Sequence, residues 1–240
     1  YEGILGKLPL FATTSLGYKN LIKLSSKSYL DSDETTDPHC KIDELKKNNK
    51  DLILLSGSHR DFFGKLFISN KLKQIEELFI EFKNFFKDKF YLEIQRSNET
   101  GEEDFENYLI ELSSKLNIPI IASQEVFYLK QDMFEAHDAL VCIGQKSYVD
   151  DNKRVRFSNQ HYLKKDIDII NLYSDIPEAL ENNYNFPYRF NFKPKKSPPI
   201  LPTIQTNKNT TVEKELLVQS QLGLANRLEK FIFKKNISKN

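Results

Sequence analysis

Three short apolar stretches of the sequence are each followed by polar residues that could do chemistry. These residues are Ser56–Arg60 after the first stretch, Glu93 and Gln95–Asn98 at the second, and Ser123–Glu125 after the third. In parallel α/β folds, the loops at the C-terminal ends of the strands build the site, so we expect one shared polar mouth. A metal-dependent phosphoesterase would need several His, Asp, Glu or Cys ligands there to bind metal ions and lower the pKa of a water. The stretches supply one imidazole and two carboxylates, those of His59, Glu93 and Glu125, which is a small ligand set.

Each of these residues also has a structural interpretation. His59 stands beside Arg60 and could cap a loop, and Glu125 could do the same. Glu93 lies between two apolar residues and therefore faces away from them, where it could pair with a buried arginine as readily as bind a metal. A structural hydrogen bond is the simpler role for His137 and Asp138. His39 and His161 lie in loop-like stretches, where the sequence indicates no ligand-type partner.

The elements that must position these residues follow from hydrophobic periodicity. The sequence predicts strands at 51–56, 90–95 and 118–123, with amphipathic helices at 71–86 and 103–116 between them. The first of these helices carries one apolar stripe at steps of three and four residues, made of Leu72, Ile75, Leu78, Phe79, Phe82 and Phe86. Strands that alternate with helices pair in parallel, so the fold class is α/β, as an open sheet or a barrel.

The remaining elements are helical, and a connector follows them. A short apolar run at 10–13 precedes a helix expected at 18–29, and further helices are expected at 133–143 and on both sides of Pro177. Residues 193–202 are too rich in proline for regular structure. Thr210 and Glu213 have capping-box spacing and predict a helix that runs to about residue 231. We therefore divide the chain into a domain at 1–202 and a second part at 203–240.

Composition limits the possible functions. The chain has 240 residues and a net charge of +1, and this balance argues against a nucleic-acid-binding module that acts alone. The two cysteines, Cys40 and Cys142, form no metal-type or redox-type pair, which favours a cytoplasmic protein. Neither a membrane-length apolar run nor a signal peptide is found in the sequence. The chain begins at Tyr1 without a methionine, so we expect a piece of a longer protein.

Several short segments of the sequence form an ordered series of recognisable motifs. The first are the helical segment Leu16–Ser25 and the strand segments Leu54–Gly57 and Phe90–Gln95. The others are Leu116–Ser123, Glu135–Ile143, Arg156–Phe157, His161–Lys164 and Asp175–Asn182. Taken in order, this series resembles the N-terminal polymerase-and-histidinol-phosphatase (PHP) domain of the bacterial DNA polymerase III alpha subunit family.

The resemblance implies a fold, an activity and partners. The fold would be an incomplete PHP-type distorted (β/α)7 barrel that lacks its N-terminal strands, and the helix after Thr211 would begin the polymerase core. The parent would be a DNA-directed DNA polymerase, a nucleotidyltransferase of DNA replication. It would work with a proofreading exonuclease subunit, a sliding clamp and primer–template DNA, and not with a membrane. Its Mg²⁺ ligands would lie outside this chain, so no cofactor is expected here. The family's His-x-His motif would precede Tyr1.

This sequence departs from the metal-binding members of the family at four positions. Ser58 replaces a cysteine, Ser97 a histidine, Glu125 an aspartate and Phe127 a histidine. We therefore expect a structural PHP segment without metal or catalytic residues, in which these positions meet at the strand exits. His59, Glu93 and Arg96 would form any residual site, and Arg96 or Arg60 would pair with the remaining carboxylates. One alternative is an active metal-dependent phosphoesterase or 3′–5′ exonuclease that uses Glu93, Glu125 and His59. The other is a separate protein-interaction module.

Overall fold

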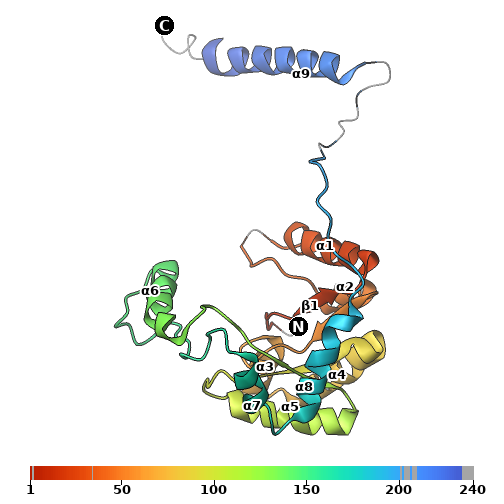
Figure 1. The fold of residues 1–240 in the computed structure, drawn as a ribbon. Helices are drawn as coiled ribbons and strands as arrows, with labels where there is room; N and C mark the ends of the chain where they lie inside the picture. The colour runs from red at the N-terminus through yellow and green to blue at the C-terminus, as the bar shows by residue number, and fades with distance from the viewer. Residues whose placement is uncertain (2, 34, 201, 203–205, 207–209, 234–240) are drawn as a thin grey trace. The chain divides into compact units, whose positions relative to one another are not determined.

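A computed structural model describes residues 1, 3–33, 35–200, 202, 206 and 210–233 (Figure 1). The chain divides into two compact units, Tyr1–Pro194 and Lys195–Asn240. Over the described residues, no helix is both long enough and apolar enough to cross a lipid bilayer.

The first unit is a mixed α/β structure around one sheet. Its strands lie in the order β1 (Leu10–Ala12), β2 (Leu52–Leu55), β3 (Phe90–Gln95) and β4 (Ile120–Ser123). Strand β2 is parallel to β3, and β3 is parallel to β4, as the sequence predicts. Strand β1 runs antiparallel to β2 at the edge of this four-stranded sheet. The carboxyl ends of β2, β3 and β4 therefore meet at one edge, where the candidate site residues follow.

Most helices of this unit lie around the sheet, whereas the helix at residues 134–145 lies apart from it (Figure 1). The α-helices of the first unit are α1 (Ser15–Leu30), α2 (Ile42–Lys47), α3 (Phe62–Ile68), α4 (Leu72–Phe86), α5 (Glu102–Leu116), α6 (Phe134–Gln145), α7 (Asp166–Leu172) and α8 (Pro177–Asn185). Three short 3₁₀ turns accompany them: η1 (Lys87–Lys89), η2 (Gln131–Met133) and η3 (Phe186–Arg189). Helices α2 and α3, which have six and seven residues, are not predicted by the sequence.

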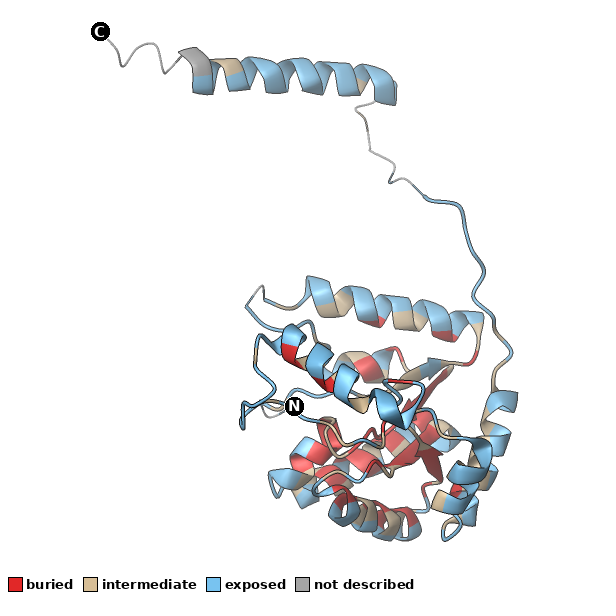
Figure 2. Cartoon of the chain, turned by 60° about the vertical axis from the view of Figure 1, so that its left-hand side comes forward, coloured by how far each residue is buried: buried red, intermediate tan, exposed pale blue. Residues whose placement is uncertain are grey.

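The core lies on both faces of the sheet, which Figure 2 shows as the buried centre of the unit. Alternate residues of β2 point to opposite faces. Leu52 and Leu54 belong to the larger cluster with the apolar stripe of α4, whereas Ile53 and Leu55 pack with Tyr91 and Ile121. Burial on both sides explains why β2 is a continuous apolar run rather than an alternating one.

Helix α1 begins earlier than the sequence predicts. Thr14 is its N-cap and accepts hydrogen bonds from the N–H groups of Leu16 and Gly17. Gly17 therefore lies inside the helix rather than before it. A Cβ atom at Gly17 would lie 2.2 Å from the carbonyl oxygen of Asp51. Gly17 is therefore needed for close packing of the helix, and not because the helix is interrupted there.

The second unit contains α9 (Val212–Arg227) and the π-helical turn η4 (Leu228–Phe233). The N-cap of α9 is Thr211, whose Oγ1 accepts from the N–H of Lys214. The helix therefore begins one residue later than the expected capping box of Thr210 and Glu213, and its third residue is Lys214 rather than Glu213. No regular structure occurs at 193–200 and 202, the described part of the proline-rich connector. The division after Pro194 lies near the expected domain boundary at 202/203, which stays a prediction.

Candidate functional site

The loop after β2 places Ser58 and His59 at the strand exits. The Ser58 hydroxyl and N–H both donate to Asp61 Oδ2, at 2.8 and 2.9 Å, so this serine is held by the start of α3. His59 is partly buried, and burial lowers its imidazole pKa, with the charge of Arg60 acting in the same direction. The neutral imidazole is therefore favoured at this position.

Glu93 on β3 is the most deeply buried carboxyl group of the site. Its Oε1 accepts hydrogen bonds from the Ser123 hydroxyl and from Gln95 Nε2, the latter at 3.0 Å. Its Oε2 is buried and has no hydrogen-bond partner among the described residues. Burial raises the pKa of Glu93 despite the two hydrogen bonds, so the protonated form is favoured.

The raised pKa of Glu93 predicts how the stability of the protein depends on pH. A raised pKa means that the folded protein keeps a proton that the unfolded chain loses above about pH 4.5. The free energy of unfolding contributed by this group therefore falls as the pH rises from 4.5. We expect Glu93→Gln, which mimics the protonated form, to match the wild type at pH 4 and to be more stable at pH 7.5.

Urea unfolding of the two proteins at both pH values measures this difference. Glu111→Gln, which removes an exposed carboxylate of α5, is the matched control and should show no such gain. A Glu93→Gln protein that is less stable than the wild type at pH 7.5 would contradict a protonated Glu93.

Ser97 lies after β3, and its backbone forms hydrogen bonds with other parts of the chain. Its N–H donates to both carboxylate oxygens of Glu102, at 2.9 and 2.8 Å, and its carbonyl accepts from the Ser158 hydroxyl. Glu102 begins α5 and is buried; burial raises its pKa, although backbone N–H groups oppose the effect. The backbone at Ser97 is thus held in place by hydrogen bonds within the chain.

A buried cluster around Glu99 and His161 joins the strand exits. His161 Nε2 lies 3.1 Å from Glu99 Oε1, and His161 Nδ1 lies 3.0 Å from the carbonyl oxygen of Glu125. Arg60 pairs with the second oxygen of Glu99, and the Ser158 N–H donates to Glu99 Oε1 at 2.8 Å. Burial by itself raises the pKa of Glu99, but these hydrogen bonds and the Arg60 charge lower it below its usual value.

The expectation that His161 has no ligand-type partner is therefore wrong. Its partner Glu99 is 62 positions away in the sequence, so the residues next to His161 do not indicate this contact. The sequence did place Glu99 close to the end of β3, two residues after Ser97, so this carboxylate could have been counted among the candidate site residues.

Phe127 forms the centre of an aromatic stack after β4. Its ring lies 4.9 Å from that of His137 at an interplanar angle of 9°, and 4.9 Å from that of His161 at 25°. Phe157 meets the same ring edge-on at 4.8 Å. Glu125 is exposed, with its Oε2 3.9 Å from His161 Nδ1. Both positions after β4 thus contact His161.

Comparison with known proteins shows which proteins this chain resembles. Residues 4–97 match the PHP domain. The chain is 34% identical over 233 residues to the DNA polymerase III subunit alpha of Rickettsia bellii, and 32% identical over 229 residues to that of Pseudomonas aeruginosa. It is 33% identical over 222 residues to that of Caulobacter vibrioides. The resemblance to a PHP segment of the alpha subunit is confirmed. These matches cover 95%, 95% and 92% of this chain, which spans about a fifth of the length of those relatives.

The strand exits bring together most of the residues that the sequence predicts. Ser58, His59 and Glu93 line one small cavity of about 10 Å³, together with Glu102, which binds Ser97. A cavity of this size has room for about one water molecule. The positions after β4 reach this region through the cluster of His161, Glu99 and Arg60.

Arg96 is not part of this group. Its guanidinium binds both oxygens of Glu106 and both oxygens of Asp175, and it lies over the Tyr173 ring. The expected ion pairs therefore differ from those found: Arg96 joins α5 to the α7–α8 turn, and Arg60 binds Glu99 rather than Glu93 or Glu125.

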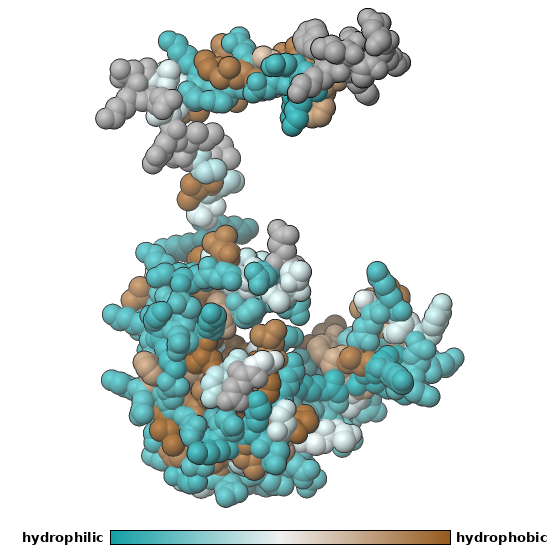
Figure 3. Space-filling model, turned by 180° about the vertical axis from the view of Figure 1, so that it is seen from behind, coloured by the Kyte–Doolittle hydropathy of each residue, from teal (hydrophilic) through white to brown (hydrophobic). Residues whose placement is uncertain are grey.

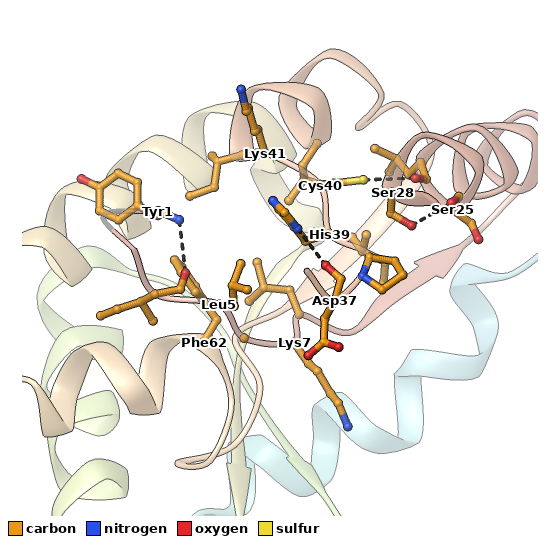
Figure 4. Close-up of a pocket in the computed structure, with 18 of the residues that line it drawn as sticks. Tyr1, Leu5, Lys7, Ser25, Ser28, Asp37, His39, Cys40, Lys41 and Phe62 are labelled. Atoms are coloured by element: carbon orange, nitrogen blue, oxygen red, sulfur yellow. Dashed lines mark hydrogen bonds between the residues drawn. The ribbon is translucent and has the colours of Figure 1, made fainter. Parts of the chain in front are cut away.

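A larger groove of about 920 Å³ lies away from the strand exits (Figure 4). The N-terminal segment, α1, residues 37–42, Leu45 and two residues of α3, Phe62 and Lys65, line it. Its polar side chains turn to backbone carbonyls: Cys40 Sγ to Leu24 at 3.1 Å, and Ser28 Oγ to Ser25 at 2.7 Å. The groove therefore offers apolar surface rather than a converging catalytic set. Leu10 of the edge strand β1 also lines it.

Proposed function

We propose that this chain is part of the alpha subunit of a bacterial replicative DNA polymerase III. The parent protein would then be a DNA-directed DNA polymerase that carries out template-directed synthesis in DNA replication in the cytoplasm. Similarity to alpha subunits over 95% of the chain supports this proposal. The chain's own contribution follows from what its residues can do.

The proposed role of the segment is structural. It would support the polymerase core and dock a proofreading exonuclease subunit, while the sliding clamp and primer–template DNA contact the parent protein. The observation that carries this role is that polar groups at the strand exits bind one another. Ser58 is held by Asp61, Ser97 by Glu102, and Glu99 by both His161 and Arg60. Such pairing stabilises loops of distant sequence against each other.

The donor chemistry supports a metal-free site. Serine hydroxyls are weak ligands for transition metals compared with thiolate and imidazole, and the phenyl ring of Phe127 offers no donor atom. A protonated carboxyl group, the form favoured for Glu93, must lose its proton before it can bind a metal. Within the described part of the chain, no group of three or more His, Cys, Asp and Glu side chains could hold a metal ion. These residues do not fit a resident metal, and the Mg²⁺ of the parent polymerase would bind elsewhere.

We also propose the finer fold, an incomplete PHP-type (β/α)7 barrel. Three parallel strands with helices between them support it, and so does the exposed edge at β1. The groove beside that edge provides apolar surface of the kind that further strands would cover.

Metal analysis of the purified chain tests the structural role. After incubation with Zn²⁺ or Mn²⁺ and gel filtration, we expect less than stoichiometric metal and no hydrolysis of phosphate esters or of DNA 3′ ends. Glu93→Ala and Glu125→Ala should leave both results unchanged.

The rival activity, a metal-dependent phosphoesterase or exonuclease, has one observation in its favour. Glu93 Oε2 has no hydrogen-bond partner among the described residues, and Glu93 lines a small cavity together with His59 and Ser58. Stoichiometric metal, together with hydrolysis that Glu93→Ala abolishes, would establish that activity and overturn the structural role.

A further inference from the structure

Helix α6 packs on the loop that follows it through one face only. Asp138 binds the guanidinium of Arg154 through hydrogen bonds of 2.5 and 2.6 Å, and both side chains are almost fully buried. Cys142, one turn later on the same face of the helix, is buried too. The lobe that α6 and this loop form is seen from behind in Figure 3, beside the main body of the first unit. The loop therefore covers the inner face of α6 and leaves the outer face to solvent.

The outer face of α6 carries an apolar stripe. Its members follow one another at steps of three and four residues, and all are exposed: Met133, Ala136, Leu140 and Ile143. Leu140 is 64% exposed and Ile143 is 75% exposed. Residues at this spacing lie along one side of a helix, and such a stripe usually packs against another element. The described part of the chain leaves this stripe uncovered, so a second molecule can bury it.

Two opposite charges flank this stripe near its ends. Glu135 lies in the first turn of α6, and Lys146 is its C-cap. They are eleven residues apart, which is about three helical turns, so both lie on the same flank of the stripe. Neither side chain forms an ion pair or a hydrogen bond with another described residue, and both are exposed. Both charges are therefore available to a partner.

We propose that this stripe pairs with its own copy, so that the α6 helices of two copies of this chain lie antiparallel about a two-fold axis. The same surface of each copy then meets the other, as symmetric dimers require. Glu135 of one copy lies opposite Lys146 of the second copy, and the same pair forms again at the other end. Leu140 is near the midpoint of these two residues, so it meets Leu140 of the second copy at the axis. Tyr148, which is 81% exposed, lies near Met133 of the second copy.

The charges favour an antiparallel pair of identical helices. Parallel helices would place Glu135 beside Glu135 and Lys146 beside Lys146, and like charges would repel at both ends. The antiparallel arrangement makes an attractive contact at each end, so a second copy matches this surface in both apolar pattern and charge. This proposal goes beyond the structural role proposed above and does not depend on it, because the residues at the strand exits take no part.

The size of the stripe sets the strength of the expected dimer. Ten residues of helix span about 15 Å, and one face of that length buries less than the roughly 800 Å² per partner of a typical stable complex. We therefore expect a weak dimer, with a Kd on the order of 100 µM.

Sedimentation equilibrium of the whole chain measures this association between about 10 µM and about 1 mM. We expect the average mass to rise with concentration from the monomer value of 28.1 kDa toward twice that value. Leu140→Ala/Ile143→Ala should weaken association at least tenfold, and because both side chains are exposed the fold should persist by circular dichroism. Ile167→Ala/Ile170→Ala is the matched control on α7, where these residues are 57% and 50% exposed, and it should associate like the wild type.

A charge exchange tests the antiparallel register. Glu135→Lys and Lys146→Glu should each weaken self-association about three- to tenfold, because each single variant places like charges opposite one another at both ends. An equimolar mixture of the two variants should associate like the wild type, since every contact is again between opposite charges. The double variant Glu135→Lys/Lys146→Glu should also self-associate. The helix dipole favours the same two charges within one helix, but it predicts no recovery on mixing.

Three results would overturn the proposal. One is a monomer mass at every concentration, and another is wild-type association by Leu140→Ala/Ile143→Ala. The third is a mixture of Glu135→Lys and Lys146→Glu that associates no better than either variant alone. In the first case the stripe would be left for a different protein partner, and in the other two the copies would meet through another surface or register.

Discussion

Gly64→Ala should lower the free energy of unfolding by about 3 kcal/mol, the upper part of the range for overpacking a well-packed position. Gly64 lies in α3, which packs on the loop that carries His59. An added Cβ atom would lie 1.8 Å from the carbonyl oxygen of His59 and 2.1 Å from its carbonyl carbon. Both are backbone atoms, so no side-chain rotation can relieve the clash. The helix must move away from the loop, and the contacts at the β2 exit must move with it.

Urea unfolding followed by circular dichroism measures this loss, with Gly144→Ala as the control. Gly144 lies in α6, and a Cβ atom there would meet no heavy atom within 4 Å. Alanine favours a helix over glycine by up to about 1 kcal/mol, so this variant should be more stable than the wild type. The same substitution is thus expected to act with opposite sign in two helices. Equal stability of Gly64→Ala and the wild type would mean that α3 does not approach the β2 exit so closely.

Phe79→Ala should lower the free energy of unfolding by about 3–5 kcal/mol. Phe79 is 0% exposed, and its ring contacts Phe63 with centroids 4.6 Å apart and Phe90 with centroids 5.5 Å apart. It therefore connects α3, α4 and β3. Removing the ring loses buried apolar area and leaves a cavity that three elements cannot fill without separating from one another.

Phe85→Ala is the matched control, because Phe85 belongs to the same helix but is 45% exposed. Its ring meets Lys46 at 5.8 Å, a contact at the surface. Both substitutions replace phenylalanine by alanine in one helix, so the difference between them reports mainly the loss of buried packing around Phe79. We expect a loss below about 1 kcal/mol for Phe85→Ala. Similar losses for the two variants would contradict the assignment of the buried stripe of α4.

Much of the first unit could be predicted because its signals are local. The stripe from Leu72 to Phe86 gives α4 its buried face, and the apolar run at 52–55 gives a strand buried on both sides. Alternation of strands and helices then requires parallel pairing, and β2, β3 and β4 are parallel. Short elements gave weaker signals, since six or seven residues span fewer than two helical turns, and so α2 and α3 were not expected.

The candidate site could be predicted only in part. Placing Ser58, Glu93 and Ser97 near one another required only the rule that parallel strands end at one edge. The partners of these residues did not follow from that rule. Arg96 binds Asp175, which is 79 residues away, and this contact depends on the path of the chain between β4 and α8.

By itself, the sequence determined the parallel strands, the main helices, the proline-rich connector and the resemblance to the PHP domain, because each depends on neighbouring residues. Only the tertiary structure decided the antiparallel edge strand β1, the burial of His161 against Glu99 and the ion pair of Asp138 with Arg154. These features join groups through space, and the folded path of the loops and the packing of the helices fix the distances between them. Hydrophobic periodicity tells which face of an element is buried, but not which distant side chain meets it there.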